Sequence, residues 1–263
     1  MTAPAKTVTV LDRILEQRRA RVAQRKFDLP PGLVRRAAET AEPARDFAAA
    51  LVRDSVCVIA ECKKASPSRG VLREDFDPAA LARGFEQAGA AALSVLTEPD
   101  YFRGDIAHLT AARKAVKVPV LRKDFIFDTW QIWEARSAGA DAFLLIAAIL
   151  DDSTLHELLT TGRGLGMEAL VEVHTREELQ RASDAGARII GVNNRDLRSL
   201  AVRLETSLEL AEAMPGDCIA VSESGIRTRG DIARLRAAGF NAFLVGEHLM
   251  QAADPAAALR DLV

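Results

Sequence analysis

A short pattern repeats four times along this chain and limits the folds that the chain can adopt. Each copy is the end of a helix, a glycine and then an apolar run with strand character. A glycine in that place suits the C′ position of a helix, where positive φ is favoured. The glycines are 50, 47 and 53 residues apart, and one βα unit takes about 25 to 30 residues, so each interval holds two units. The four glycines are Gly89, Gly139, Gly186 and Gly239.

Eight strand-like runs result when the apolar runs between these copies are included. Amphipathic stretches separate the runs: one starts at Asp77-Pro78, with Asp77 as N-cap and Pro78 at the first helical position, and another covers residues 208–214. Such alternation indicates a parallel sheet, and eight units predict an α/β fold, the (β/α)8 or TIM barrel. An open doubly wound sheet is the alternative, but no G-x-G-x-x-G follows the first run. The expected strands are 56–62, 92–97, 118–123, 142–146, 169–173, 189–193, 218–223 and 242–246.

About 50 residues precede the first strand. Five of them fall on one mostly apolar helical face: Leu11, Ile14, Leu15, Arg18 and Val22. We therefore expect a single domain, with an N-terminal helical extension over residues 1–50 and a barrel over residues 56–263. The extension either packs on the barrel or forms a lid over its active end.

Composition excludes several classes of partner. The net charge is −2 and both signs are interspersed, so the basic surface that nucleic acid needs is missing. No apolar run approaches the roughly 18 residues of a membrane span, and the first residues lack a signal peptide's apolar core. We expect a cytoplasmic monomer. Cys57, Cys62 and Cys218 show no metal-ligand spacing, which favours buried free thiols.

Charged residues gather at the predicted carboxyl ends of the strands, where barrel enzymes have their active sites. Glu61 and Lys63 end the first strand and point the same way, because residues two apart share a face. Burying such charges is costly unless they are matched or used, so the set predicts an active site. Further polar residues at these ends are Lys123, Glu172, Asn193, Arg195 and Glu223.

Two short glycine-containing loops indicate a phosphate site. Ser224-Gly225 follows the seventh strand, and Gly246-Glu247 follows the eighth. Backbone N–H groups in such loops can face an anion, and the loops after strands seven and eight are the usual phosphate site of this fold. We therefore expect a phosphorylated small molecule as the ligand.

The residues at the strand ends resemble those of the indole-3-glycerol phosphate synthase family, and the likeness runs from about Leu11 to Leu262. Other phosphosugar barrels share the phosphate loops, but not the Glu-x-Lys-Lys-x-Ser-Pro-Ser sequence that starts at Glu61. The segments that carry the resemblance are 59–70, 94–97, 120–125, 170–174, 191–197 and 222–226.

The resemblance implies a lyase, a decarboxylase of tryptophan biosynthesis that uses neither cofactor nor metal. It would convert 1-(2-carboxyphenylamino)-1-deoxyribulose 5-phosphate into indole-3-glycerol phosphate, with loss of carbon dioxide and water. Lys123 would then be the general acid at the ketone oxygen, and Glu61 would favour its ammonium form. Glu172 would be the base of the dehydration, with Lys63 or Lys123 as the acid.

The same resemblance implies how the substrate is bound. His174, near the active end, is expected to orient a neighbour or to pack. Glu223 would bind a hydroxyl or act electrostatically. The side chain of Glu247 is expected to turn outward, because it carries the same charge as phosphate. The residues expected near the substrate's carboxylate or hydroxyls are Lys63, Ser66, Asn193 and Arg195, those around its aromatic ring are Phe102, Phe125 and Leu144, and those at its phosphate are Ser224, Gly225, Gly246 and Glu247.

Two other functions are weighed against this one. An isomerase of the phosphoribosylanthranilate isomerase type would need a cysteine and an aspartate at the ends of strands one and five. Glu61, Lys63 and Glu172 stand there instead, and Cys57 and Cys62 are expected to face outward. A non-catalytic phosphate-ligand binder would tolerate the loss of Lys123 or Glu172, yet both are present. The loop over residues 65–72 is expected to be mobile without ligand.

Overall fold

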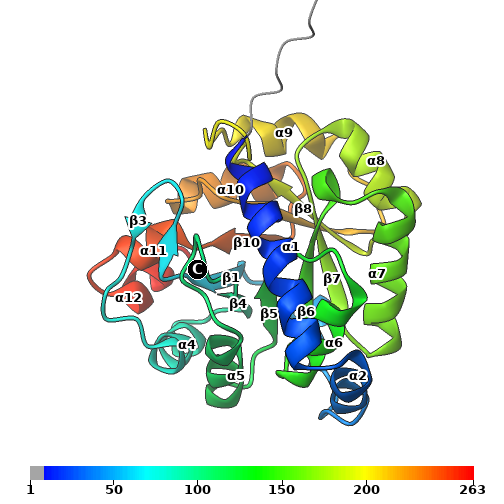
Figure 1. Ribbon diagram of the computed structural model, residues 1–263. Coiled ribbons are helices and arrows are strands. Elements are labelled where there is room, and N and C mark those ends of the chain that lie inside the picture. Colours follow the sequence, from blue (N-terminus) through cyan, green and yellow to red (C-terminus); the bar gives the residue numbers. More distant parts are fainter. Residues whose placement is uncertain (1–8) are drawn as a thin grey trace, which may run out of the picture.

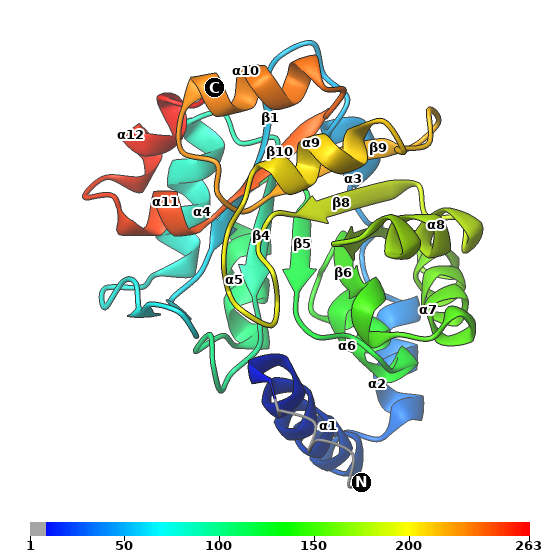
Figure 2. The ribbon, with the colours of Figure 1, turned by 90° about the horizontal axis from the view of Figure 1, so that it is seen from above.

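Eight parallel strands close into a barrel with helices around it in the computed structural model, which describes residues 9–263 (Figures 1 and 2). The strand order is β1-β10-β9-β8-β7-β6-β5-β4, so the first and last strands pair and no barrel edge stays open. The predicted (β/α)8 barrel is confirmed. The barrel strands are β1 (Cys57–Cys62), β4 (Ala92–Leu96), β5 (Val120–Lys123), β6 (Ala142–Ile146), β7 (Glu168–Val173), β8 (Ile189–Asn193), β9 (Ile219–Glu223) and β10 (Ala242–Val245).

The remaining elements are a small hairpin and the helices. The hairpin follows β1 within residues 65–72, where mobility stays a prediction. It consists of β2 (Ala65–Ser66) and β3 (Gly70–Val71). The helices are α1 (Val10–Asp28), α2 (Pro31–Glu39), α3 (Phe47–Ala50), α4 (Pro78–Gln87), α5 (Ile106–Ala115), α6 (Thr129–Ser137), the 3-10 turn η1 (Ala147–Ile149), α7 (Asp152–Gly164), α8 (Arg176–Asp184), α9 (Glu205–Ala211), α10 (Arg229–Ala237), α11 (Glu247–Gln251) and α12 (Pro255–Arg260).

Local sequence signals set most element boundaries. The four repeat glycines all have positive φ, between 80° and 102°, so each ends a helix in the conformation that glycine adopts without strain. Asp77 caps α4, because its carboxylate accepts hydrogen bonds from the backbone of Ala79 and Ala80. The helix expected over residues 208–214 instead spans Glu205–Ala211, and no side chain caps its start at Leu204.

Alternation along the strands separates two apolar regions. Ala60 and Cys62 face the surrounding helices, whereas Cys57 and Ile59 lie in the barrel interior. The expectation that Cys57 faces outward is wrong, because Cys57 is two residues from Ile59 and four from Glu61 and so shares their face. It sits about 13 Å from Glu61 along β1, at the amino end of the barrel.

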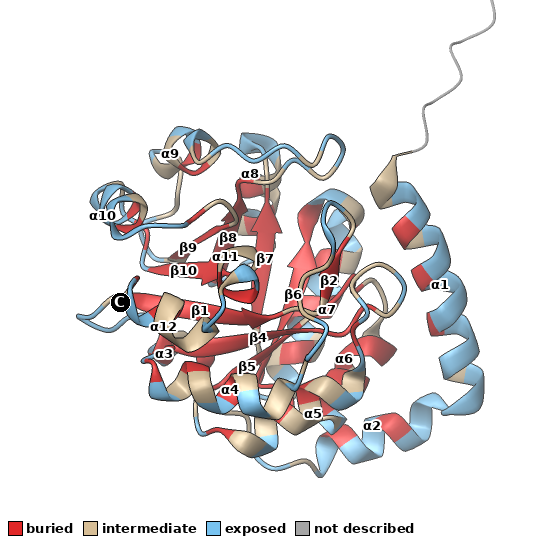
Figure 3. Ribbon diagram, turned by 90° about the vertical axis from the view of Figure 1, so that its left-hand side faces the viewer, coloured by how far each residue is buried: buried red, intermediate tan, exposed pale blue. Residues whose placement is uncertain are grey.

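Residues 9–50 of the N-terminal extension run from one end of the barrel to the other; residues 1–8 lie outside the described part of the chain. Helix α1 lies at the carboxyl ends of the strands, where Ile14 packs with Phe125 and Arg18 binds Asp124 through two hydrogen bonds of 2.8 and 2.6 Å. Helix α2 packs on α6, and Phe47 of α3 joins the interior cluster that contains Cys57. Figure 3 shows that only a narrow stripe of α1 is buried. Within residues 9–263, no helix is long and apolar enough to cross a membrane.

Candidate active site

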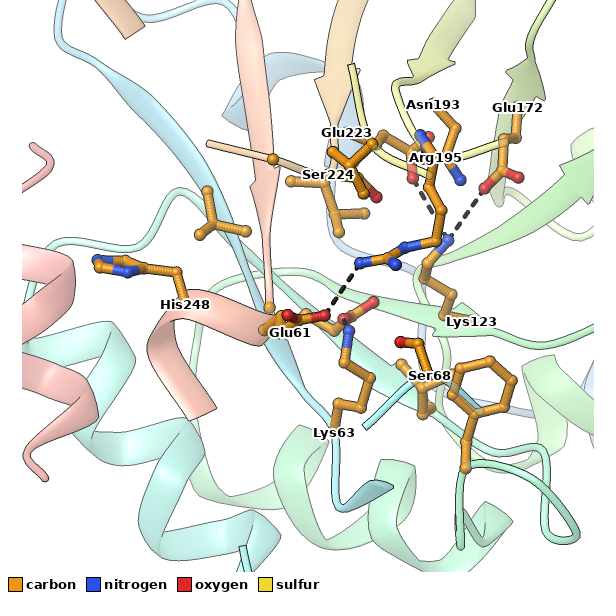
Figure 4. Close-up of a pocket in the computed structure, with 18 of the residues that line it drawn as sticks. Glu61, Lys63, Ser68, Lys123, Glu172, Asn193, Arg195, Glu223, Ser224 and His248 are labelled. Carbon is orange, nitrogen blue, oxygen red and sulfur yellow. Dashed lines mark hydrogen bonds and ion pairs between the residues drawn. The ribbon is translucent and has the colours of Figure 1, made fainter. Parts of the chain in front are cut away.

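A cavity of about 690 Å³ opens at the carboxyl ends of the strands. Its charged and polar lining comes from the ends of β1, β5, β7, β8 and β9, from the loops after β1 and β8, and from the start of α11. Figure 4 shows members of this lining converging from different sides. Helix α1 lies beside this cavity, but its residues, all of them described, do not line it.

Lys123 stands between two buried carboxylates. Its Nζ lies 3.1 Å from Oε2 of Glu172 and 3.3 Å from Oε2 of Glu223 (Figure 4). Burial disfavours the charge of Lys123, but the carboxylates of Glu172, Glu223 and Glu61 outweigh burial and raise its pKa. Lys123 is therefore an ammonium ion at neutral pH, as the role of a general acid requires.

The two carboxylates beside Lys123 differ in protonation. Burial favours the neutral form of Glu172, but the charges of Lys123 and His174 and a hydrogen bond from Asn193 lower its pKa. Burial and the charges of Glu172 and Glu61 outweigh Lys123 and raise the pKa of Glu223 to about 7. Glu172 is thus a carboxylate at neutral pH, whereas Glu223 is partly protonated there.

Glu61 and Lys63 form a second ion pair on the first strand. Nζ of Lys63 lies 2.5 Å from Oε2 of Glu61, whose side chain is 3% exposed. The carboxylate of Glu61 fills the space next to the backbone of Gly246. A Cβ atom at Gly246 would collide with this carboxylate. A Cβ atom at Gly191 would likewise collide with Oε1 of Glu223. This oxygen is buried and has no hydrogen-bond partner in the described part of the chain.

An ion triad crosses the mouth of the cavity. Glu247 accepts a hydrogen bond of 2.9 Å from Arg195 and one of 3.2 Å from Arg69. Its side chain therefore lines the cavity, and the expectation that it turns outward is wrong. Two arginines that lie 52 and 178 residues away in sequence hold it there. Asn193 positions Arg195 by accepting a 3.0 Å hydrogen bond from its backbone.

Apolar side chains form one wall of the cavity, and the two glycine loops form another. The rings of Phe102 and Phe125 are 6.2 Å apart at an angle of 43°, and Leu144 lies beside them in the lining. Ser224 and Gly225 both have positive φ, 67° and 83°. They line the cavity together with Gly246 and Glu247.

The predicted site residues come together with one exception. Ser66 is outside the cavity lining, and its hydroxyl lies 3.4 Å from that of Ser68, which does line the cavity. Sequence reasoning also missed Arg69 as a member of the site, although the Ser-Pro-Ser-Arg-Gly run that carries it was singled out. Among residues 9–263, no group of three or more His, Cys, Asp or Glu side chains could hold a metal ion.

His174 lies behind Glu172. Its Nε2 is 3.5 Å from Oε1 of Glu172, and its Nδ1 is 3.3 Å from Oε2 of Glu178. It therefore contacts a predicted catalytic residue without lining the cavity.

A closed barrel with an acid–base cluster at its carboxyl end defines a (β/α)8-barrel enzyme. The family model for indole-3-glycerol phosphate synthase matches residues 11–262. The chain belongs to the indole-3-glycerol phosphate synthase family, which confirms the resemblance read from the sequence.

Curated relatives agree with this placement, and a solved structure agrees with the fold. The indole-3-glycerol phosphate synthase of Roseiflexus sp. (strain RS-1) is 50% identical, over 97% of this chain and 98% of its own length. That of Albidiferax ferrireducens is 49% identical, over 96% and 97%. The structure of 3-hexulose-6-phosphate synthase from Salmonella typhimurium matches with a TM-score of 0.63 over 79% of this chain and 96% of its own, and at 15% identity it shows the fold alone.

Proposed function

We propose that this chain converts 1-(2-carboxyphenylamino)-1-deoxyribulose 5-phosphate into indole-3-glycerol phosphate, with loss of carbon dioxide and water. Family membership over residues 11–262 supports the reaction. The observation that carries the chemistry is the ammonium group of Lys123, held within 3.1 Å of Glu172 and 3.3 Å of Glu223 at the bottom of an open cavity. The proposed substrate is a phosphorylated small molecule, for which the glycine loops after β9 and β10 are suited.

Ring closure needs an acid at the ketone oxygen. The ring carbon that bears the carboxylate attacks the ketone carbon, and the electron pair of the C=O bond moves to oxygen. Lys123 gives that oxygen a proton, and the aniline nitrogen becomes an iminium. Decarboxylation then breaks the bond to the carboxylate, and its electron pair returns to the ring and neutralises the iminium. The substrate thus supplies its own electron sink.

Dehydration needs a base and an acid at the same time. Glu172 takes a proton from the CH₂ group next to nitrogen, and the hydroxyl leaves as water with a proton from Lys63 or Lys123. The lowered pKa of Glu172 keeps it in the carboxylate form that a base requires. Which lysine acts in this step is decided by the position of the hydroxyl relative to the two ammonium groups.

The rest of the cavity suits the other parts of this substrate. Phe102, Phe125 and Leu144 offer apolar contact to the aromatic ring. The backbone of Ser224-Gly225 and Gly246 receives the phosphate. Oε1 of Glu223, buried and unpaired among the described residues, can bind a sugar hydroxyl. Lys63, Asn193 and Arg195 remain for the carboxylate and the other hydroxyls. Ser66 lies outside the lining, and its hydroxyl can act on the substrate through Ser68, 3.4 Å away.

The alternatives receive less support. Cys62 faces the helices and Cys57 lies at the opposite end of the barrel, so no cysteine reaches the cavity from β1. The isomerase reading therefore lacks the cysteine of its acid–base pair. Incubation of the purified chain with the carboxyphenylamino-deoxyribulose phosphate tests the proposal, with indole fluorescence and released carbon dioxide as readouts. Tight binding without product would favour a non-catalytic binder.

A monomeric state and a cytoplasmic location stay predictions.

A further inference from the structure

A line of three titratable groups leads away from the cavity behind Glu172. Oε2 of Glu172 faces Lys123 at 3.1 Å, and Oε1 faces Nε2 of His174 at 3.5 Å. Nδ1 of His174 faces Glu178 at 3.3 Å. Nε2 is buried and has no hydrogen-bond partner within residues 9–263.

Glu178 determines which nitrogen of His174 can exchange a proton. It lies in the first turn of α8, where its carboxylate accepts a 2.7 Å hydrogen bond from the backbone of His174 and lies beside Nδ1. A carboxylate at Nδ1 keeps a proton on that nitrogen. Nε2 is then the atom that gains or loses a proton. Without one, its lone pair would face the carboxylate of Glu172, and two acceptors would meet in a buried place.

The proposed reaction consumes one proton in each turnover. The substrate's carboxylate is ionised and leaves as neutral carbon dioxide. Two protons are added to the ketone oxygen before it leaves as water, and only one is taken from carbon. Glu172 can return the proton that it took from carbon, but one further lysine proton stays missing after each turnover until it is replaced, and that proton must come from a group other than substrate.

We propose that His174 is a proton reservoir that recharges Lys123 through Glu172, an inference that rests on the proposed function. The imidazolium of His174 gives its Nε2 proton to Oε1 of the Glu172 carboxylate. The neutral carboxyl group then turns about its Cγ–Cδ bond, so that the protonated oxygen faces Lys123, and the same proton passes to the neutral amine. Glu172 ends as a carboxylate, Lys123 as an ammonium ion and His174 as a neutral imidazole. When product has left, water in the cavity returns a proton to Nε2 through Glu172, which lines the cavity.

The surroundings of His174 favour its protonated, imidazolium form. Burial opposes the imidazolium, but the hydrogen bond to Glu178 and the charges of Glu172 and Glu223 outweigh burial and raise the pKa of His174. His174 therefore carries the stored proton below its raised pKa and loses this proton as pH rises through that pKa. The titratable groups around His174 are Glu172, Glu178, Glu223, Lys123 and Asp196.

The test compares kcat against pH for the wild type, H174Q and E178Q. Glutamine at position 174 can donate a hydrogen bond but cannot carry a proton. We expect H174Q to lose about tenfold in kcat, less than the 10² to 10⁴ typical of a general acid or base, because Lys123 and Glu172 remain. The change in KM should stay below about twofold, because His174 lies outside the cavity lining. The alkaline fall of kcat that belongs to His174 should disappear. The exposed His156 provides a matched control in H156Q, which should behave as wild type.

E178Q separates a proton store from simple packing. Removal of the carboxylate lowers the pKa of His174, so the alkaline fall of kcat should move to lower pH while the fold stays intact. NMR titration of the His174 ring should move in the same direction. If the wild type is active and H174Q keeps both the wild-type kcat and the alkaline fall of kcat, the proposed role of His174 is overturned and the proposed function is not. An inactive wild type would overturn the proposed function.

Discussion

The carboxylate of Glu172 lies between two cationic groups, 3.1 Å from Lys123 and 3.5 Å from His174. This position keeps Glu172 ionised although its side chain is only 2% exposed. A buried carboxylate that stays charged beside an ammonium donor provides a base and an acid within one hydrogen-bonded unit.

Glu172→Gln should stop the reaction after decarboxylation. Glutamine keeps the shape of the side chain but cannot take the proton from carbon, so kcat should fall by about 10² to 10⁴. A single turnover should release carbon dioxide without indole fluorescence, because ring closure needs Lys123 rather than Glu172. Equal rates of carbon dioxide release and indole formation, both near those of the wild type, would contradict the role of Glu172 as the base.

Arg18→Ala should destabilise the protein by about 3 kcal/mol, because it leaves a fully buried Asp124 with one fewer cationic partner. Arg122 at 3.1 Å still pairs with Asp124, which limits the loss. Arg21→Ala on the same helix is the matched control: its partner is Asp100, its side chain is 54% exposed, and the cost should stay below about 1 kcal/mol. Urea unfolding of both variants measures the difference, and equal costs would contradict the importance of burial.

Gly246→Ala should impair activity, because its Cβ atom would displace the carboxylate of Glu61 from Lys63. We expect a destabilisation of about 1 to 3 kcal/mol and weaker binding of inorganic phosphate. Gly216→Ala is the control, since nothing lies within 4 Å of a Cβ atom there. Calorimetric titration of both variants with phosphate would show whether the space at Gly246 matters.

The stability difference between Glu223→Gln and the wild type should depend on pH. Burial raises the pKa of Glu223 to about 7 in the folded state, above about 4.3 for an unperturbed glutamate. The stability that this proton contributes is complete below about pH 4 and is lost as pH rises through about 7. From pH 5 to pH 8, the variant should gain up to about 3 kcal/mol relative to the wild type. Parallel stability curves from thermal unfolding would contradict the raised pKa.

Local pattern was enough to predict the barrel and most of its strands. Glycines after helices and runs of apolar residues are short-range signals, so β6 and β8 have the predicted bounds. Helix α9 has no side-chain cap at its start, and its predicted position was displaced by several residues. Parity along a strand is also a local signal, and Cys57 was assigned to the wrong face although counting from Glu61 gives the right one.

Long-range pairing limited the prediction of the site. The carboxylate of Glu247 turns inward because Arg69 and Arg195 meet it across the cavity mouth, and no local rule brings these three together. The hairpin after β1 places Ser68 rather than Ser66 at the cavity. The meeting of the charged strand-end residues in one cavity was predictable, because every barrel strand aims its last inward side chains at the same opening.

Lys123→Gln tests the central claim most directly. Substrate binding by calorimetric titration and indole formation should be measured on this variant beside the wild type. Glutamine cannot protonate the ketone oxygen, so we predict a Kd within about tenfold of the wild type and a loss of about 10² to 10⁴ in turnover. Turnover at the wild-type rate in Lys123→Gln would contradict the account, because ring closure would then proceed without the acid that Glu172 and Glu223 keep charged.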